Sequence, residues 1–125
     1  MNGRSIARPM KTSSFFLYQG PGRISIARYA PKGIAAGFKI YRALAPTAKM
    51  LKMSRDQYVP RYAAILDQLS PQHVWDDLHA LAGDDEPVLL CWERPPFSET
   101  RFCHRRLVAE WFADRLGQEV EEVNV

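Results

Sequence analysis

The pattern of apolar and polar positions predicts three helices and one buried strand in the second part of the chain. Apolar residues recur at helical spacing over residues 54–69, 71–82 and about 102–116. Ser70, Pro71 and Gly83 provide the N-cap, the first-turn residue and the stop signal of the middle helix. Residues 86–93 hold an unbroken apolar run, Val88 to Trp92, which is typical of a strand buried on both faces.

The pattern before residue 54 predicts shorter elements. Residues 13–19 are expected to form a first strand, which ends at the turn signal 20–22, and alternation over 23–30 predicts a second strand. Residues 31–46 are interpreted as a loop with a short extended piece at 38–41, and 47–53 as two helical turns. Pro60 predicts a late start or a bend in the helix that contains it.

The order of these elements predicts the fold class. Helix, helix, buried strand, loop and helix, followed by a short strand at 119–123, indicate a single α/β domain with a small, mostly parallel sheet flanked by helices. Residues 1–12 are predicted to be a flexible N-terminal extension and 13–125 to be the domain. Both Met1 and Met10 fit as the natural start.

Composition narrows the class of protein. Apolar residues make up 46% of the chain and charged residues 25%, as in a soluble globular protein. The longest apolar runs are far shorter than the roughly 20 residues that cross a bilayer, so no membrane association is expected. The N-terminus lacks the apolar core of a secretory signal. The two cysteines are therefore predicted to be reduced thiols in a cytoplasmic protein.

Charge is distributed unevenly along the chain. Residues 1–61 contain 12 Lys and Arg against one acid, a net charge of +11, whereas residues 62–125 contain 5 against 13, a net charge of −8. This asymmetry fits two halves that attract each other within one fold. It also fits a basic surface for nucleic acid, with Lys39, Arg42, Lys49 and Lys52 as phosphate contacts, and this remains an alternative function.

The main candidate site lies where the buried strand leads through a loop into the last helix. A helix N-terminus at the carboxyl end of a strand offers free backbone N–H groups and a partial positive charge to an anion. Cys103 is a candidate nucleophile there, with His104 and Glu93 as acid–base groups. The predicted ligand-binding residues are Arg105, Arg106, Cys91 and Trp92.

Other interpretations of these residues stay open. Cys91 also fits a buried apolar position, and Cys103 and His104 also fit a packed helix start. Proximity of the two cysteines would make reversible disulfide formation a competing account. Zinc is disfavoured, because adjacent residues on a helix diverge by about 100°, and no metal and no cofactor is predicted.

The segment "PVLLCWERPPFSETRFCHRRLVAEWFADRLG" resembles the signature of the DUF488 family, in which a Leu-Leu-Cys-x-Glu strand precedes a Cys-His-Arg helix start. The Ala45-Pro46 segment and the Tyr-x3-Tyr helix at Tyr58 resemble further parts of that family, over roughly 14–122. The resemblance implies an α/β fold and a shared site, which falls on Cys91, Glu93, Cys103, His104 and Arg105. It implies no particular activity.

Together these observations predict a protein that binds a small molecule bearing a phosphate or carboxylate, such as a nucleotide, with cysteine-based catalysis as an extension of that role. A nucleic-acid-associated module and a thiol redox or metal sensor are the alternatives. The sequence leaves the oligomeric state, the substrate and the reaction undetermined.

Overall fold

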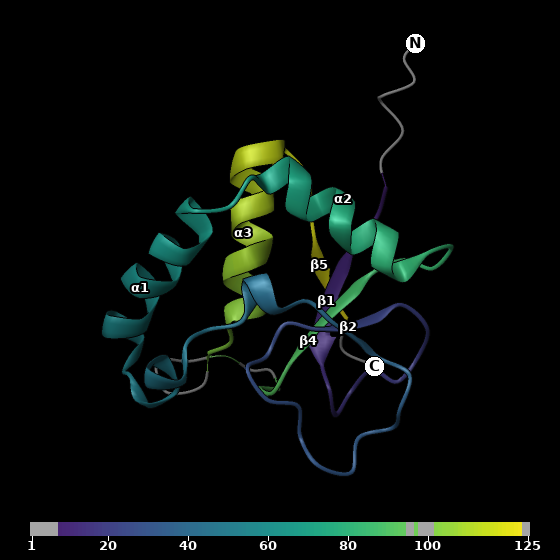
Figure 1. Ribbon diagram of the computed structural model, residues 1–125, viewed down its shortest axis with the longest axis horizontal. Coiled ribbons are helices and arrows are strands. Elements are labelled where there is room, and N and C mark those ends of the chain that lie inside the picture. The colour runs from purple at the N-terminus through teal and green to yellow at the C-terminus, as the bar shows by residue number, and fades with distance from the viewer. Residues whose placement is uncertain (1–7, 95–96, 98–101, 124–125) are drawn as a thin grey trace.

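The computed structural model describes residues 8–94, 97 and 102–123. Within this part the chain folds into a five-stranded parallel sheet and three α-helices (Figure 1). The strands are β1 (Lys11–Ser14), β2 (Arg23–Ser25), β3 (Lys39–Ile40), β4 (Val88–Cys91) and β5 (Glu121–Glu122), in the spatial order β3-β2-β4-β1-β5. The predicted α/β class is confirmed, and every strand pair is parallel.

The helices form where the apolar periodicity predicts them. They are α1 (Arg55–Asp67), α2 (Pro71–Ala82) and α3 (His104–Leu116), and two short 3-10 helices, η2 (Arg42–Leu44) and η3 (Ala48–Lys52), precede α1. The Ser70 hydroxyl accepts a hydrogen bond from the His73 N–H and so caps α2 as predicted. Of the late start or bend that Pro60 predicted, the late start is wrong, since α1 begins at Arg55 under a capping box and continues through Pro60.

The first strand differs most from the prediction. It begins at Lys11, earlier than the predicted segment 13–19, and ends at Ser14, because the chain then turns through hydrogen bonds from the N–H groups of Leu17 and Tyr18 to the Ser14 carbonyl. The expected flexible extension therefore contributes Lys11 and Thr12 to the sheet. Residues 1–7 of that extension lie outside the described residues.

Alternating residues of β4 divide the core between the two faces of the sheet. Leu89 packs in the larger cluster, together with apolar residues of α1, α2 and α3. Val88 and Leu90 pack in a smaller cluster with Phe15 and Ala27. In Figure 1 the three helices lie on one side of the sheet and the long coil between β2 and β3 lies on the other. None of the helices in the described part has the length and apolarity that crossing a membrane requires.

Because all strands run in one direction, their carboxyl ends meet at one edge of the sheet. Cys91 is the last residue of β4, and the chain leaving the neighbouring β2 continues through Ile26 to Tyr29 at the same edge. The fold thus places the predicted Cys-His-Arg segment, which begins α3, beside the ends of two central strands.

Candidate functional site

A pocket of about 380 Å³ opens at the carboxyl edge of β2 and β4. One wall comes from the segments that follow these strands, and the other from η3 and the start of α1. All three residues predicted from the sequence to be catalytic, Cys103, His104 and Glu93, line this pocket. Of the four predicted ligand-binding residues, Cys91 and Trp92 line it. Pro46, which the family resemblance singled out, lines it as well.

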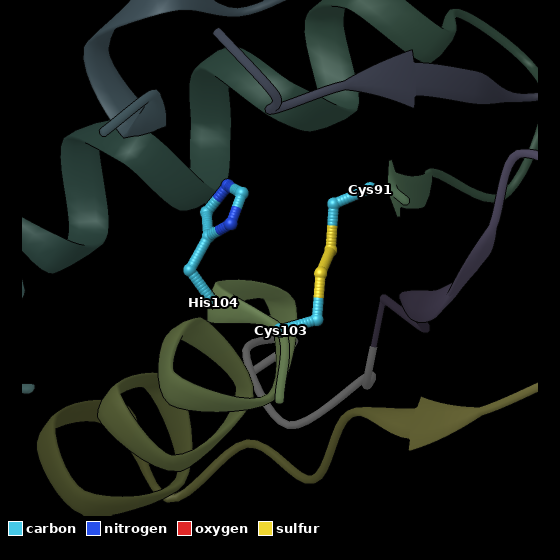
Figure 2. A group of neighbouring side chains, drawn as sticks. All are labelled: Cys91, Cys103 and His104. Carbon is cyan, nitrogen blue, oxygen red and sulfur yellow. A yellow bond between two sulfur atoms is a disulfide. The ribbon is translucent and has the colours of Figure 1, made fainter. Parts of the chain in front are cut away.

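The two cysteines are joined by a disulfide at this pocket (Figure 2). Their Cα atoms are 6.8 Å apart, within the range that a disulfide bridges. Cys91 is 1% exposed, whereas Cys103, the N-cap residue of α3, is 8% exposed. The prediction of two reduced thiols is therefore wrong for this structure, because the strand end and the helix start bring the sulfur atoms into bonding contact.

His104 is the first residue of α3 and is buried against the Tyr62 ring. Its Nε2 lies 2.6 Å from the Ile26 carbonyl oxygen, which can only accept a hydrogen bond, so Nε2 carries the proton and Nδ1 keeps a lone pair. Figure 2 shows the ring edge with one nitrogen turned toward the sulfur atoms.

Burial determines the charge of this imidazole. The pKa of His104 is lowered to about 4, chiefly by burial; the hydrogen bond to Ile26 opposes this shift, and the nearby Arg105 adds a smaller lowering. His104 is therefore neutral at pH 7. This geometry does not favour the predicted role of His104 as a cation or proton carrier near neutral pH.

Arg105 is fully buried and is held by the protein itself. Its Nε and Nη2 donate to the Glu122 carboxylate, with the shortest contact at 2.6 Å, and its Nη1 lies 3.2 Å from the Cys91 sulfur. Arg106 donates from Nη1 to the Thr12 hydroxyl and the Val120 carbonyl, both at 2.9 Å. Neither guanidinium lines the pocket, so the geometry does not favour the predicted grip of Arg105 and Arg106 on a bound anion.

The rim of the pocket contains residues that the sequence analysis missed. Tyr29 is 59% exposed, and its carbonyl accepts a hydrogen bond from the indole N–H of Trp92, which is 46% exposed. The Arg28 guanidinium lies over the Tyr29 ring, 5.8 Å from its centroid. The sequence analysis placed Arg28 and Tyr29 inside the predicted strand 23–30, whereas β2 ends at Ser25. The two residues therefore lie beyond its carboxyl end, where ligands commonly bind in parallel sheets.

Ion pairs with acids of the second half neutralise part of the positive charge of residues 1–61. Arg8 pairs with Asp76 and Lys11 with Glu86, in each case a first-half cation with a second-half acid. The proposed phosphate contacts are exposed but are distributed over three elements: Lys39 in β3, Arg42 in η2, and Lys49 and Lys52 in η3. Nucleic-acid binding through these residues stays a prediction.

The Arg105–Glu122 pair gives a first test of this site. Arg105→Met should lower the free energy of unfolding by about 3–5 kcal/mol, because it leaves the Glu122 carboxylate buried without its cation. The double variant Arg105→Met/Glu122→Met should recover a large part of that loss. Urea denaturation of the two single variants and the double variant measures both effects.

Arg115→Met is the matched control, since Arg115 and its partner Asp67 are more than half exposed and the loss should stay below about 1 kcal/mol. Equal losses for Arg105→Met and Arg115→Met would contradict a special role for the buried pair.

Because the pKa of His104 is lowered in the folded protein, the free energy of unfolding should depend on pH. The unfolded chain binds a proton at His104 with a pKa of about 6.5, whereas the folded chain does so at about 4. The contribution of a neutral His104 is thus complete above pH 6.5 and is lost as the pH falls toward 4, by up to about 3 kcal/mol.

Urea denaturation of the oxidised protein between pH 7.5 and 4.5 measures this loss. His104→Gln should remove it, whereas His73→Gln, which changes an exposed histidine, should leave it in place. An unchanged pH slope in His104→Gln would refute the assignment to His104.

Comparison with known proteins supports the resemblance seen in the sequence. No curated protein gives a significant match, and no solved structure does so either. The family model DUF488-N3a, described as the active DUF488-N3 subclade, matches residues 18–116. That range contains β2 to β4, all three helices and the Cys91, Cys103 and His104 cluster. The chain therefore belongs to the DUF488 family.

Proposed function

We propose that this protein is a thiol-dependent enzyme in which Cys103 and Cys91 cycle between dithiol and disulfide against a small substrate bound in the pocket. The observation that carries the proposal is the disulfide between two cysteines that both line the pocket. The description of the matched DUF488-N3a group as an active subclade supports an enzymatic role.

The two sulfur atoms have different surroundings, which indicates different roles for them in thiol exchange. Cys103 is the more exposed thiol and stands at the N-cap of α3, where the free N–H groups of the first turn favour a thiolate. Cys91 is more deeply buried, and the Arg105 guanidinium at 3.2 Å favours its thiolate. Cys103 is therefore the attacking thiol and Cys91 the thiol that resolves the intermediate.

The reaction is a two-step thiol–disulfide exchange. The Cys103 thiolate attacks one sulfur of a substrate disulfide, whose S–S bond breaks, and the other half leaves as a thiol after taking a proton from solvent. The Cys91 thiolate then attacks the Cys103 sulfur, which releases the second half as a thiol and forms the protein disulfide. The substrate gains two electrons and two protons, and a dithiol reductant returns the protein to the reduced state.

The pocket favours a substrate with a planar apolar part and an anionic group. Met50, Met53, Tyr58 and Phe102 supply an apolar wall, and the rings of Trp92 and Tyr29 are exposed at the rim. Arg28 adds a cation that no ion pair neutralises among the described residues, and Glu93 adds one carboxylate. The small anionic ligand predicted from the sequence is thus retained, with Arg28 in place of Arg105 and Arg106 as its partner.

The aromatic, carboxylate-bearing disulfide 5,5′-dithiobis(2-nitrobenzoate) tests the mechanism. The reduced wild-type protein should release two thionitrobenzoate ions per chain and end as the Cys91–Cys103 disulfide. Cys91→Ser should release one ion and keep the other half as a mixed disulfide on Cys103, which mass spectrometry detects. In Cys103→Ser, release should slow by about tenfold or more, because Cys91 is buried and cannot be reached directly.

The outcome that contradicts the mechanism is equally clear. Release from Cys103→Ser at the wild-type rate, or slow and independent alkylation of both thiols by iodoacetamide at pH 6, would exclude Cys103 as the attacking group.

The charge at the rim should control the choice of substrate. Arg28→Gln should slow exchange with the anionic aromatic disulfide about fivefold, the effect of losing about 1 kcal/mol of attraction, and should not slow exchange with the cationic disulfide cystamine. Glu93→Gln should slow the cystamine reaction instead. Arg42→Gln, which removes an exposed arginine that does not line the pocket, is the control for net charge. Identical effects of Arg28→Gln and Arg42→Gln would show that the rim does not select the substrate.

A further inference from the structure

We propose that the reduced form of the site binds one divalent transition-metal ion of the zinc class through the sulfur atoms of Cys91 and Cys103 and Nδ1 of His104, with a fourth coordination position open to the pocket. This inference does not depend on thiol exchange. It concerns the dithiol state of the same cysteines, because a disulfide offers no thiolate to a metal ion.

The spacing of the three side chains supports a shared ion. Their potential ligand atoms all lie within 4.8 Å of one another, and all three residues are buried. Two sulfur atoms and one nitrogen around a tetrahedral zinc ion lie roughly 3.5–3.8 Å apart, given bonds of about 2.3 Å to sulfur and about 2.0 Å to nitrogen. Opening the disulfide and separating the sulfur atoms along their side chains brings the cluster to this spacing, since the Cα atoms are already 6.8 Å apart.

The local backbone removes the objection that the sequence raised against zinc. That objection assumed that Cys103 and His104 are both helical and therefore diverge. Cys103 instead precedes the helix with an extended backbone, φ −139° and ψ 139°, and α3 begins at His104. From this start of α3 the Cys103 side chain reaches Cys91 at the end of β4, and the His104 side chain runs beside it to the Ile26 carbonyl, as Figure 2 shows for the labelled residues.

The surroundings of His104 are those of a metal ligand. Histidines that bind metals nearly always donate their other ring N–H to a carbonyl or carboxylate, which fixes the tautomer and the ring orientation. Nε2 of His104 does so to the Ile26 carbonyl, at 2.6 Å and fully buried. Nδ1 is thereby left with a lone pair on the side of the sulfur atoms and has no hydrogen-bond partner among the described residues.

The charge of the two thiolates and the opening to the pocket also fit a site for a divalent metal ion. Two thiolates neutralise a divalent cation, and the Arg105 N–H group at 3.2 Å stabilises the Cys91 sulfur as a thiolate. Reduction of the disulfide by a dithiol adds two electrons and two protons, and metal binding then releases both thiol protons to solvent. Three protein ligands with a fourth side toward an open pocket match reactive zinc sites, whereas structural sites use four protein ligands.

Titration of the reduced full-length protein with Zn²⁺ and Co²⁺ under argon tests the proposal. One ion should bind per chain, and the Co²⁺ form should show sulfur-to-metal charge transfer together with the intense visible bands of tetrahedral cobalt. The oxidised protein should bind neither ion. Cys91→Ser, Cys103→Ser and His104→Gln should each weaken Zn²⁺ binding by about 100-fold or more.

His104→Gln is the decisive variant, because a glutamine amide can still donate to Ile26 while both thiols stay in place. It should lose metal affinity, while His73→Gln, a change of an exposed histidine, should keep it. Absence of binding by the reduced wild-type protein, or equal binding by its oxidised form, would overturn the metal site. Thiol exchange that persists in either case would show that the proposed function holds without it.

Discussion

The buried ion pair between Arg105 and Glu122 is the interaction on which the site depends. Arg105 belongs to the first turn of α3, Glu122 to β5, and the remaining N–H group of the guanidinium contacts the sulfur at the end of β4. One side chain thus fixes a helix start, an edge strand and a cysteine relative to one another. Because a fully buried guanidinium is costly without its carboxylate, the position of β5 is tied to the position of the cysteines.

The sequence was informative wherever local chemistry decides the outcome. The capping residues of α2 and the apolar run of β4 each specify their element without distant partners, and both predictions are confirmed. β1 was misplaced because it is a polar segment in a buried position. Thr12, Ser13 and Ser14 are all buried, and their hydroxyl partners are Glu122, Val123 and Trp92, which are distant in the sequence. No period-two pattern can identify a strand whose side chains are satisfied in this way.

The sequence predicted where the pocket lies and part of its lining, but not the contacts that Arg105 and Arg106 make inside the protein. The strand–loop–helix order correctly placed Cys91, Cys103 and His104 at one edge of the sheet. Their states depend on contacts that no local motif records: the Ile26 carbonyl that fixes the imidazole, and the Glu122 carboxylate that withdraws Arg105 from the pocket. Two adjacent arginines beside a cysteine therefore suggest an anion site in the sequence. In the fold, Arg105 pairs with Glu122, and Arg106 donates hydrogen bonds to Thr12 and Val120.

The pairing of β1 with β5 has a consequence for how the protein comes to be folded. These strands join residues about 110 positions apart, Lys11 with Glu121 and Thr12 with Glu122. A chain made from its N-terminus onward has synthesised β1, all three helices and both cysteines before Glu122 exists. Until then the Thr12 hydroxyl and the Arg105 guanidinium lack a shared carboxylate, and loop closure over this separation is slow. β5 completes the surroundings of the cysteines, so these surroundings are complete only once the chain has been synthesised as far as Glu122.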